Sequence, residues 1–519
     1  MDKLLQHQIG QLLLAGFPST EVDEQARTLI EEYQVGNFIL FAQNMQDARQ
    51  VARLCGGLSD RAFAQNGLAP FIAADQEGGT VSRITQGAAL FPGAMALGAA
   101  ATEDEVRQVG KNCGAMLRAM GVNVNLAPVL DVNSEPMNPV IGIRSFGDDP
   151  QQVARLGCAM AEGMVEGGVL AVVKHYPGHG NVQTDSHLDL PTNNSDPALL
   201  EETEFLPFRR AFERGVPALM SCHIRFPRID PQPPATLSPT ILNGILRERQ
   251  GFSGLVFTDC LEMEAIQKGW GVGEGAVLAV LAGCDVLCIS HHLEAVKAAA
   301  EALYQAVQTG RIPRERIRQS YDRVLAAKKQ MGLDVRQHID PEAAIAAVEE
   351  PDRLALHRAL SRRSVTCVSG DPELVCRAKK PLFVAPVTHA ATGVEDAAHN
   401  GLSFARLAAQ ALGGEYLEID REPDEAQQQA VLEQAARADV VVLGVQNARF
   451  RPGLSELIRT LSDAGHPLAL VLLAGPWDIP LLPRAALLAA AYEYTALSVS
   501  SVIDALRTGR FSGHLPVRL

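Results

Sequence analysis

The sequence predicts a (β/α)8 TIM-like barrel followed by a smaller α/β sandwich domain. Two observations lead to this fold class. Short apolar, β-branched runs alternate with longer stretches of helical periodicity, and eight such runs occur within roughly the first 300 residues. Eight parallel strands close into a barrel, whereas an open doubly wound sheet more often has about five or six. We therefore favour the barrel over the doubly wound sheet.

The barrel strands are short apolar runs, as expected of strands that are buried on both faces of a parallel sheet. In chain order they are residues 11–15, 37–41, 71–74, 122–126, 170–173, 217–220, 254–257 and 285–289. A helical stretch, residues 314–331, follows the last strand. We assign residues 1–332 to the barrel domain.

A polar segment with a short Ala-rich helix between two prolines comes next, and we assign residues 333–362 to a linker and helix. The second domain is predicted to cover residues 363–519. Apolar runs and helical stretches alternate again in this domain. The predicted strands are residues 364–369, 381–387, 439–445 and 468–473, and the predicted helices are residues 403–412 and 423–437.

Composition excludes several classes of protein. The chain has 519 residues, 47% of them apolar and 20% charged, which is typical of a globular protein. Its 46 Lys and Arg against 60 Asp and Glu give a formal charge of -14, with no basic block, so nucleic acid is not an expected partner.

The sequence also predicts the location of the protein and the state of its cysteines. The most apolar stretch, residues 468–492, is interrupted by prolines and charges, so no membrane span or membrane partner is predicted. The N-terminus lacks the basic start and cleavage site of a signal peptide, from which we infer the cytoplasm. Nine cysteines without CxxC spacing predict neither disulfides nor zinc binding.

Polar residues come directly after several of the predicted barrel strands. They are Asp75, Gln76 and Glu77 after the third strand, Lys174 and His175 after the fifth, His223 after the sixth and Asp259 after the seventh. In a barrel the carboxyl ends of all strands form one rim, so these side chains should converge on one mouth. Any one of them could be a helix cap or a hydrogen-bonded rim residue. Together they predict an active site.

The segment KHYPGHGNVQTDSHLDLP contains His175, His179, Asp185 and His187, and it allows two interpretations. The first interpretation is a metal site built from these four residues. Pro177 and Gly178 exclude a helical zinc pair, but a loop-built site stays open. In the other, the Asp185 carboxylate orients the His187 imidazole and stabilises its protonated form, which makes His187 a general acid.

The predicted set of residues suits cleavage of a glycosidic bond. This reaction needs a proton for the leaving oxygen on one side of the sugar carbon and a carboxylate on the other. His187 with Asp185 can supply the proton, and Asp259 can act as nucleophile or electrostatic stabiliser. Hydrogen-bonding groups for a polyhydroxylated substrate are present in Asp75, Arg144 and Lys174.

Several motifs resemble those of the bacterial β-N-acetylglucosaminidases of glycoside hydrolase family 3. They are KHYPGHGNVQTDSH, DQEGGTVSR, NLAPVLDVN, IGIRSFGDDP and GFSGLVFTDCLEM, and they occur in the family's order within residues 71–263. The closing GRFSGHLPVRL and the two-domain layout resemble the longer members of this family. Cys260 stands where the family usually has a second acidic residue.

The resemblance implies a retaining, exo-acting enzyme that removes terminal β-linked N-acetylglucosamine without cofactor or metal. Asp259 becomes the nucleophile that forms the glycosyl-enzyme intermediate, His187 the acid/base and Asp185 its partner. The positions that match the family's sugar-binding residues are Asp75, Arg83, Arg144, Lys174 and His175. We add His223, which follows the sixth strand, to the substrate-binding candidates.

Other functions stay open at this point. A histidine does not repel incoming phosphate as a carboxylate does, so the enzyme could be a phosphorylase. A metal-dependent barrel hydrolase and a sugar-binding protein without activity are the further alternatives. By analogy with the family, the substrate is a GlcNAc-terminated muropeptide of peptidoglycan recycling, but oligosaccharides derived from chitin or mucin fit the motifs equally well.

Overall fold

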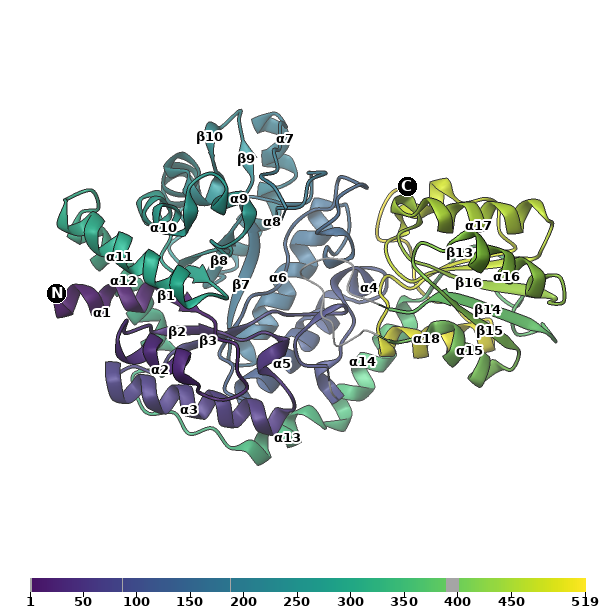
Figure 1. Cartoon of the computed structure of the whole chain (residues 1–519), viewed down its shortest axis with the longest axis horizontal. Coiled ribbons are helices and arrows are strands. Elements are labelled where there is room, and N and C mark those ends of the chain that lie inside the picture. The colour runs from purple at the N-terminus through teal and green to yellow at the C-terminus, as the bar shows by residue number, and fades with distance from the viewer. Residues whose placement is uncertain (1, 86, 187, 389–400) are drawn as a thin grey trace.

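The computed structural model describes residues 2–85, 87–186, 188–388 and 401–519. Its larger part is a barrel of eight parallel strands surrounded by helices, and a smaller α/β layered unit lies beside it (Figure 1). No helix in the described ranges is long and apolar enough to cross a membrane.

The eight barrel strands occur at the predicted places along the chain. They are β1 (Leu13–Ala15), β2 (Asn37–Ile39), β3 (Phe71–Ala74), β6 (Val124–Asn125), β7 (Leu170–Tyr176), β8 (Ala218–Ser221), β11 (Leu255–Thr258) and β12 (Leu287–Ile289). Neighbours in this order pair in parallel, β12 returns to β1, and a bridge between Phe257 and Val286 joins β11 to β12. The barrel prediction is confirmed.

Helices connect the strands and form the outer layer. They are α2 (Glu24–Glu31), α3 (Ala48–Asn66), α5 (Glu103–Ala119), α6 (Pro150–Glu166), α7 (Pro197–Glu202), α8 (Phe205–Glu213), η5 (Thr240–Arg249), α9 (Glu264–Gln267), α10 (Gly271–Ala282), α11 (Leu293–Gln308) and α12 (Arg314–Gln330). Alternate strand residues face opposite ways, as the pleat requires. Phe71 and Ala73 pack inside the barrel, whereas Ile72 and Ala74 pack against the helices.

The first strand is shorter than predicted. Its first two expected residues, Gln11 and Leu12, instead end helix α1 (Lys3–Leu12). Asp2 caps this helix by accepting hydrogen bonds from the backbone N–H groups of Leu4 and Leu5. Buried Leu5, Ile9 and Leu12 follow a helical spacing, which outweighs the strand-like run of leucines.

Two segments lead from the barrel to the second sheet. Helix α13 (Pro341–Val348) packs against α3 and α5, and helix α14 (Pro351–Ser364) packs against α18 (Ala496–Thr508). The linker and domain boundaries assigned from the sequence stay predictions, but the change from barrel to sheet occurs within this helical stretch.

The second sheet has six strands in the order β13-β18-β17-β16-β14-β15. They are β13 (Thr366–Gly370), β14 (Pro381–Pro386), β15 (Glu415–Ile419), β16 (Val440–Val445), β17 (Leu468–Leu472) and β18 (Leu487–Ala490). Only β13 runs antiparallel to its neighbour. Helices α16 (Glu425–Ala435) and α17 (Pro452–Asp463) cover one face, and α15 (Phe404–Leu412) and α18 cover the other.

Strands β15 and β18 were not predicted. The exposed edge strand β15 has the sequence EYLEI, whose two glutamates hide its apolar alternation. Strand β18 reads LLAA and follows a proline-rich stretch, so its run is short and rich in alanine. Strand β15 forms by pairing with β14, and β18 forms by pairing with β13 and β17. These pairings outweigh intrinsic strand preference, because that preference is weak and depends on context.

The two units share buried contacts. Met95, Ala96 and Ala99, which lie in or next to helix α4 (Ala94–Gly98) after β3, belong to the apolar core of the second domain. Next to them Glu493 is buried, and its carboxylate accepts hydrogen bonds from the Gly93 N–H at 2.7 Å and from the Thr495 hydroxyl at 3.1 Å. Burial raises the pKa of Glu493 to about 7.

This carboxyl makes the stability of the junction depend on pH. Between pH 4.5, the ordinary pKa, and about 7, folded Glu493 holds a proton that the unfolded chain has lost, so raising the pH destabilises the fold. We expect Glu493→Gln to raise the free energy of unfolding at pH 8 by up to about 3 kcal/mol, and to do little at pH 4. Thermal denaturation at both pH values measures this.

The exposed Glu456→Gln in α17 is the control and should change neither midpoint. If Glu493→Gln were no more stable than the wild-type protein at pH 8, burial of the charged carboxylate would not destabilise the fold as we expect.

Candidate active site

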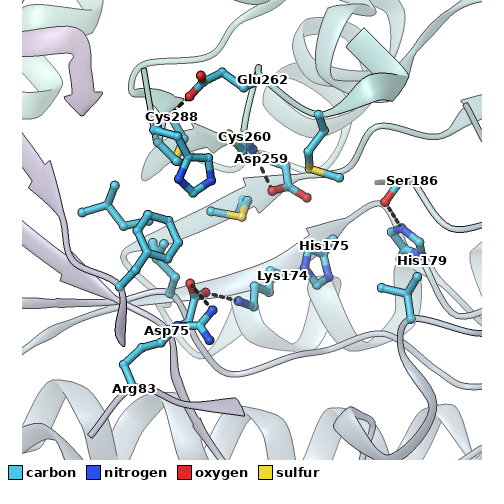
Figure 2. A pocket seen from close by; sticks show the side chains of 18 of the residues that line it. Asp75, Arg83, Lys174, His175, His179, Ser186, Asp259, Cys260, Glu262 and Cys288 are labelled. Carbon is cyan, nitrogen blue, oxygen red and sulfur yellow. Dashed lines mark hydrogen bonds and ion pairs between the residues drawn. The ribbon is translucent and has the colours of Figure 1, made fainter. Parts of the chain in front are cut away.

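A cavity of about 600 Å³ opens at the carboxyl ends of the barrel strands. It is lined by residues that follow β3, β6, β7, β11 and β12 (Figure 2). The predicted site residues that line it are Asp75, Arg83, Arg144, Lys174, His175 and Asp259. The barrel therefore brings together six of the nine residues predicted from positions far apart in the sequence.

One wall of the cavity consists of Asp75 and two cations. The Nζ atom of Lys174 donates to Asp75 Oδ1 at 2.7 Å, and the Arg83 guanidinium lies 3.4 Å from Oδ2 (Figure 2). Burial would raise the pKa of Asp75, but the charges of Lys174 and Arg83 outweigh it and hold that pKa below the usual range. Asp75 is therefore a charged acceptor facing the cavity.

Glu77 was expected at the rim but was given no role, yet it connects Arg144 and Lys174, the two most buried cations of the cavity. Its carboxylate accepts a bidentate pair of bonds from Arg144, at 2.8 and 2.9 Å, and lies 2.7 Å from Lys174 Nζ. Burial would raise the pKa of Glu77, but both cations lower it strongly. The signal in the sequence was its place two residues after Asp75, on the short strand β4 (Gln76–Gly78).

Asp131 is a second residue that the sequence analysis did not select. Its side chain is fully buried, lies 2.6 Å from His175 Nδ1, and accepts hydrogen bonds from the backbone N–H groups of His175 and His179. It therefore fixes the turn that follows β7 and the orientation of the His175 ring. Its apolar neighbours in the motif NLAPVLDVN concealed this role.

His179 is also buried at the cavity wall. Burial and the neighbouring His175 lower the pKa of His179 to about 4, so its ring is neutral at pH 7. Its Nε2 atom lies 2.9 Å from the hydroxyl of Ser186, which lines the cavity as well. This contact ties the segment after Asp185 to the turn after β7.

Asp259 lies across the cavity from Asp75. It directly follows β11, and its Oδ1 atom accepts a hydrogen bond from the Cys260 N–H at 2.7 Å, which orients the carboxylate. Figure 2 shows Asp259 on the opposite side of the cavity from Asp75 and Lys174, with His175 beside Lys174. A sugar ring between these walls would meet hydrogen-bonding groups on one side and a carboxylate on the other.

His223 lies in a different environment from the one expected for a substrate-binding residue. It is fully buried and is not among the described residues that line the cavity. Its Nε2 atom donates to the Cys260 carbonyl oxygen at 2.9 Å, and Nδ1 lies 2.9 Å from the Thr236 hydroxyl. His223 thus supports the backbone next to Asp259.

The predicted acid/base pair is described only in part. His187 lies outside the described residues. Asp185 is half-buried, and its carbonyl oxygen accepts hydrogen bonds from the backbone N–H groups of Leu188 and Asp189. The structure thus places Asp185 in a turn that follows the buried cavity-lining segment at His179.

The described part of the chain contains no cluster of three or more His, Cys, Asp or Glu residues that could hold a metal ion. In the metal hypothesis His175 and His179 are ligands. Their ring atoms instead contact Asp131 and Ser186. The fourth residue of that set, His187, lies outside the described ranges.

A polar cavity at the carboxyl end of a barrel, lined by a carboxylate and by buried charges, has the location and composition of an enzyme active site. Comparison with known proteins makes this class specific. The family model described as the N-terminal domain of glycosyl hydrolase family 3 matches residues 4–327, and the chain belongs to this family of glycoside hydrolases.

Relatives and solved structures agree with the assignment. The chain is 31% identical to Beta-hexosaminidase A of Pseudoalteromonas piscicida over 64% of its own length and 62% of the relative's, so the match spans less than two thirds of that protein. It is 33% identical to the Beta-hexosaminidase of Nitrosomonas eutropha, covering 67% of this chain and 97% of that one. The solved family 3 β-N-acetylglucosaminidase of Paenibacillus sp. strain FPU-7 is 37% identical, with a TM-score of 0.92 over 99% of this chain and 98% of that one.

The role of Glu77 in holding Arg144 can be tested by measuring the stability of a variant. Glu77→Gln leaves the Arg144 guanidinium buried without its charged partner, and breaking one side of a buried ion pair costs about 3–5 kcal/mol. We expect denaturant unfolding of this variant to show a loss of that order. The exposed Glu202→Gln in α7 is the control and should stay within about 0.5 kcal/mol of the wild-type protein. Equal stability of the two variants would contradict the role assigned to Glu77.

Proposed function

We propose that the chain is a retaining, exo-acting β-N-acetylglucosaminidase that removes terminal β-linked N-acetylglucosamine. The observation that carries this proposal is the arrangement of one cavity, in which the Asp259 carboxylate faces a wall of Asp75, Arg83 and Lys174. The names of the hexosaminidase relatives and of the 37% identical Paenibacillus enzyme support the choice of N-acetylglucosamine.

Recognition of the sugar falls to the buried charges. Asp75 accepts hydrogen bonds from hydroxyl groups, and Arg144, Lys174 and His175 donate to them. Because these groups are already held by Glu77 and Asp131, little side-chain freedom is lost when the sugar binds. Hydrogen bonds to charged groups in such a buried site are stronger than those between neutral groups.

In the first chemical step an Asp259 oxygen attacks C1 of the sugar from the face opposite the leaving group. A bond forms between C1 and the carboxylate oxygen while the glycosidic C1–O bond breaks, and the leaving oxygen takes a proton from the His187 imidazolium. In the second step His187 takes a proton from water, the water oxygen attacks C1, and Asp259 is released. Two displacements retain the configuration.

The Asp185–His187 pair replaces the second carboxylic acid that most glycosidases use. Asp185 orients the imidazole and stabilises its charged form, and the neutral form then serves as the base. The segment that carries both residues begins at His179, which Asp131 anchors through its backbone N–H. Asp185 is therefore carried by a segment whose start is anchored by Asp131.

The compartment and the physiological substrate are part of this proposal. We place the enzyme in the cytoplasm, with GlcNAc-terminated muropeptides of peptidoglycan recycling as substrates. A phosphorylase is the second candidate, since a histidine acid/base does not repel phosphate.

The deciding assay uses an aryl β-N-acetylglucosaminide with and without phosphate, and the matching aryl β-glucoside as control. Free N-acetylglucosamine in both conditions would establish a hydrolase. A sugar 1-phosphate formed only with phosphate would reassign the enzyme as a phosphorylase, and no turnover of either substrate would overturn the glycosidase proposal.

Asp259 can be identified as the nucleophile by trapping. An activated 5-fluoro derivative of N-acetylglucosamine should inactivate the wild-type enzyme and add one sugar to the peptide that contains Asp259, as mass spectrometry would show. Asp259→Ala should take up no label and lose at least about 10³-fold in kcat. Glu264→Gln, which changes another carboxylate at the rim of the same cavity, should still be labelled. A label on any other residue would contradict the assignment.

The acid/base pair can be tested by leaving-group dependence. His187→Ala should lose about 10²–10⁴-fold in kcat/KM toward substrates with poor leaving groups, but much less toward activated aryl glycosides, which need no proton. Asp185→Asn should change the rates in the same direction. Asp189→Asn, an exposed carboxylate in the same segment, is the control. An equal loss on both kinds of substrate in the His187 variant would argue against an acid role.

A further inference from the structure

Two cysteines are neighbours in the wall of the barrel cavity. Cys260 directly follows Asp259, Cys288 lies in the middle of β12, and both side chains line the cavity on the side of Asp259 (Figure 2). The backbone N–H of Leu261 donates to the Cys288 carbonyl oxygen at 2.9 Å, which holds the segment after β11 against β12. The Cys288 thiol donates a hydrogen bond to the Cys260 sulfur. The two sulfurs are therefore in contact in a cavity that small molecules can enter.

The surroundings of Cys260 favour its charged form. Besides the Cys288 thiol, the Ser290 hydroxyl and the Glu262 backbone N–H donate to its sulfur. The hydrogen bond from Cys288 is the largest of these effects, and together they hold the pKa of Cys260 below its usual range. Burial instead raises the pKa of Cys55 in α3. Because the thiolate is the reactive form of cysteine, the half-buried Cys260 combines reactivity with access from the cavity.

The backbone of Cys260 also holds the proposed nucleophile. Its N–H donates to Asp259 Oδ1 at 2.7 Å, and its carbonyl oxygen accepts from His223 Nε2 at 2.9 Å. Cys288 is fixed within the barrel sheet, where its N–H donates to Thr258 Oγ1 at 2.9 Å. A bond that draws the two sulfurs together must therefore move mainly Cys260, and this movement reaches Asp259.

We propose that Cys260 and Cys288 form an oxidation site, in which hydrogen peroxide converts the two thiols into a disulfide that reversibly inactivates the enzyme. A low-pKa, accessible cysteine beside a second thiol is the arrangement of redox-sensing cysteines. Cytoplasmic disulfides, where they occur, are usually transient ones of this kind. The effect on activity rests on the proposed function, because it assumes that Asp259 is the nucleophile.

The oxidation takes place in two balanced steps. The Cys260 thiolate attacks one oxygen of the peroxide, so that an S–O bond forms, the O–O bond breaks, and the departing hydroxide takes up a proton to leave as water. The Cys288 sulfur then attacks the sulfenic sulfur of Cys260. An S–S bond forms, the S–O bond breaks, and the second hydroxide leaves as water with the proton of the Cys288 thiol. A dithiol reductant reverses the reaction by thiol–disulfide exchange.

The disulfide changes the geometry next to the reacting carboxylate. It brings the sulfurs from hydrogen-bonding distance to about 2.05 Å. Because Cys288 is held in its strand, the Cys260 backbone shifts, and the hydrogen bond that orients Asp259 shifts with it. A displacement of about 1 Å at a reacting group can cost about 10²-fold in rate.

The test exposes the reduced full-length enzyme to hydrogen peroxide, removes the peroxide with catalase, and measures cleavage of an aryl β-N-acetylglucosaminide. In parallel, mass spectrometry of a non-reducing digest locates disulfides. We expect the wild-type protein to yield one cross-linked pair of peptides, containing Cys260 and Cys288, and to lose about 10²-fold in kcat. Dithiothreitol should remove the cross-link and restore the rate.

Three variants, each compared with its own untreated activity, separate the roles of the thiols. Cys260→Ser should show no loss that dithiothreitol restores. Cys288→Ser cannot close the disulfide, so its Cys260 should proceed to the sulfinic acid, and dithiothreitol should no longer restore the rate. Cys376→Ser removes an exposed cysteine of the second domain and is the control, which should respond as the wild-type protein does.

Two outcomes would overturn the oxidation site. They are the absence of the Cys260–Cys288 cross-link from the oxidised wild-type protein, and a reversible loss of the same size in Cys260→Ser. A mapped disulfide that leaves the rate unchanged would overturn the control of activity. Failure of the untreated wild-type enzyme to cleave the aryl glycoside would instead overturn the proposed function, while the digest would still decide whether the disulfide forms.

Discussion

The buried ion pairs around Glu77 are the interaction on which the rest of the site depends. Removing four charged side chains from water is costly unless each meets an opposite charge at hydrogen-bonding distance. Here Glu77 holds Arg144 and Lys174, and Lys174 in turn holds Asp75. These residues come from the segments after β3 and β6 and from β7 itself, so the pairs form only when the barrel closes. Their balance of charge gives the cavity a rigid polar wall before any sugar arrives.

The opposite wall is supported in the same way, by hydrogen bonds from neighbouring groups. His223 holds the Cys260 carbonyl oxygen, and the Cys260 N–H holds Asp259. Asp131 holds the ring of His175 and the backbone of His179. Asp259 and His175, which are proposed to carry or support the chemistry, therefore occupy fixed positions at strand ends.

The second domain contributes to the cavities as well as to stability. Glu493 and the apolar residues of α4 fix it against the barrel. Once fixed, it presents the residues after β16 and β17 to the edge of the sugar-binding cavity. A barrel mouth alone would leave this side open to solvent. The charged and aromatic side chains of the second domain close this side.

By itself the sequence determined the number and order of the barrel strands and the residues that follow them. Buried parallel strands are visible in a sequence as apolar runs, and the carboxyl ends of these runs lie at the mouth of the barrel. Position and motif also selected Asp259 and the charged residues that the barrel gathers in one cavity. Only the tertiary structure decided which side chains contact one another. Asp131 and Glu77 gain importance only from residues distant in the chain. His223 contacts Thr236 and the Cys260 carbonyl oxygen, and β15 forms because β14 pairs with it. Hydrogen bonds and ion pairs between distant segments leave no periodic trace in a sequence, since any compatible side chain at the right point in space can make them.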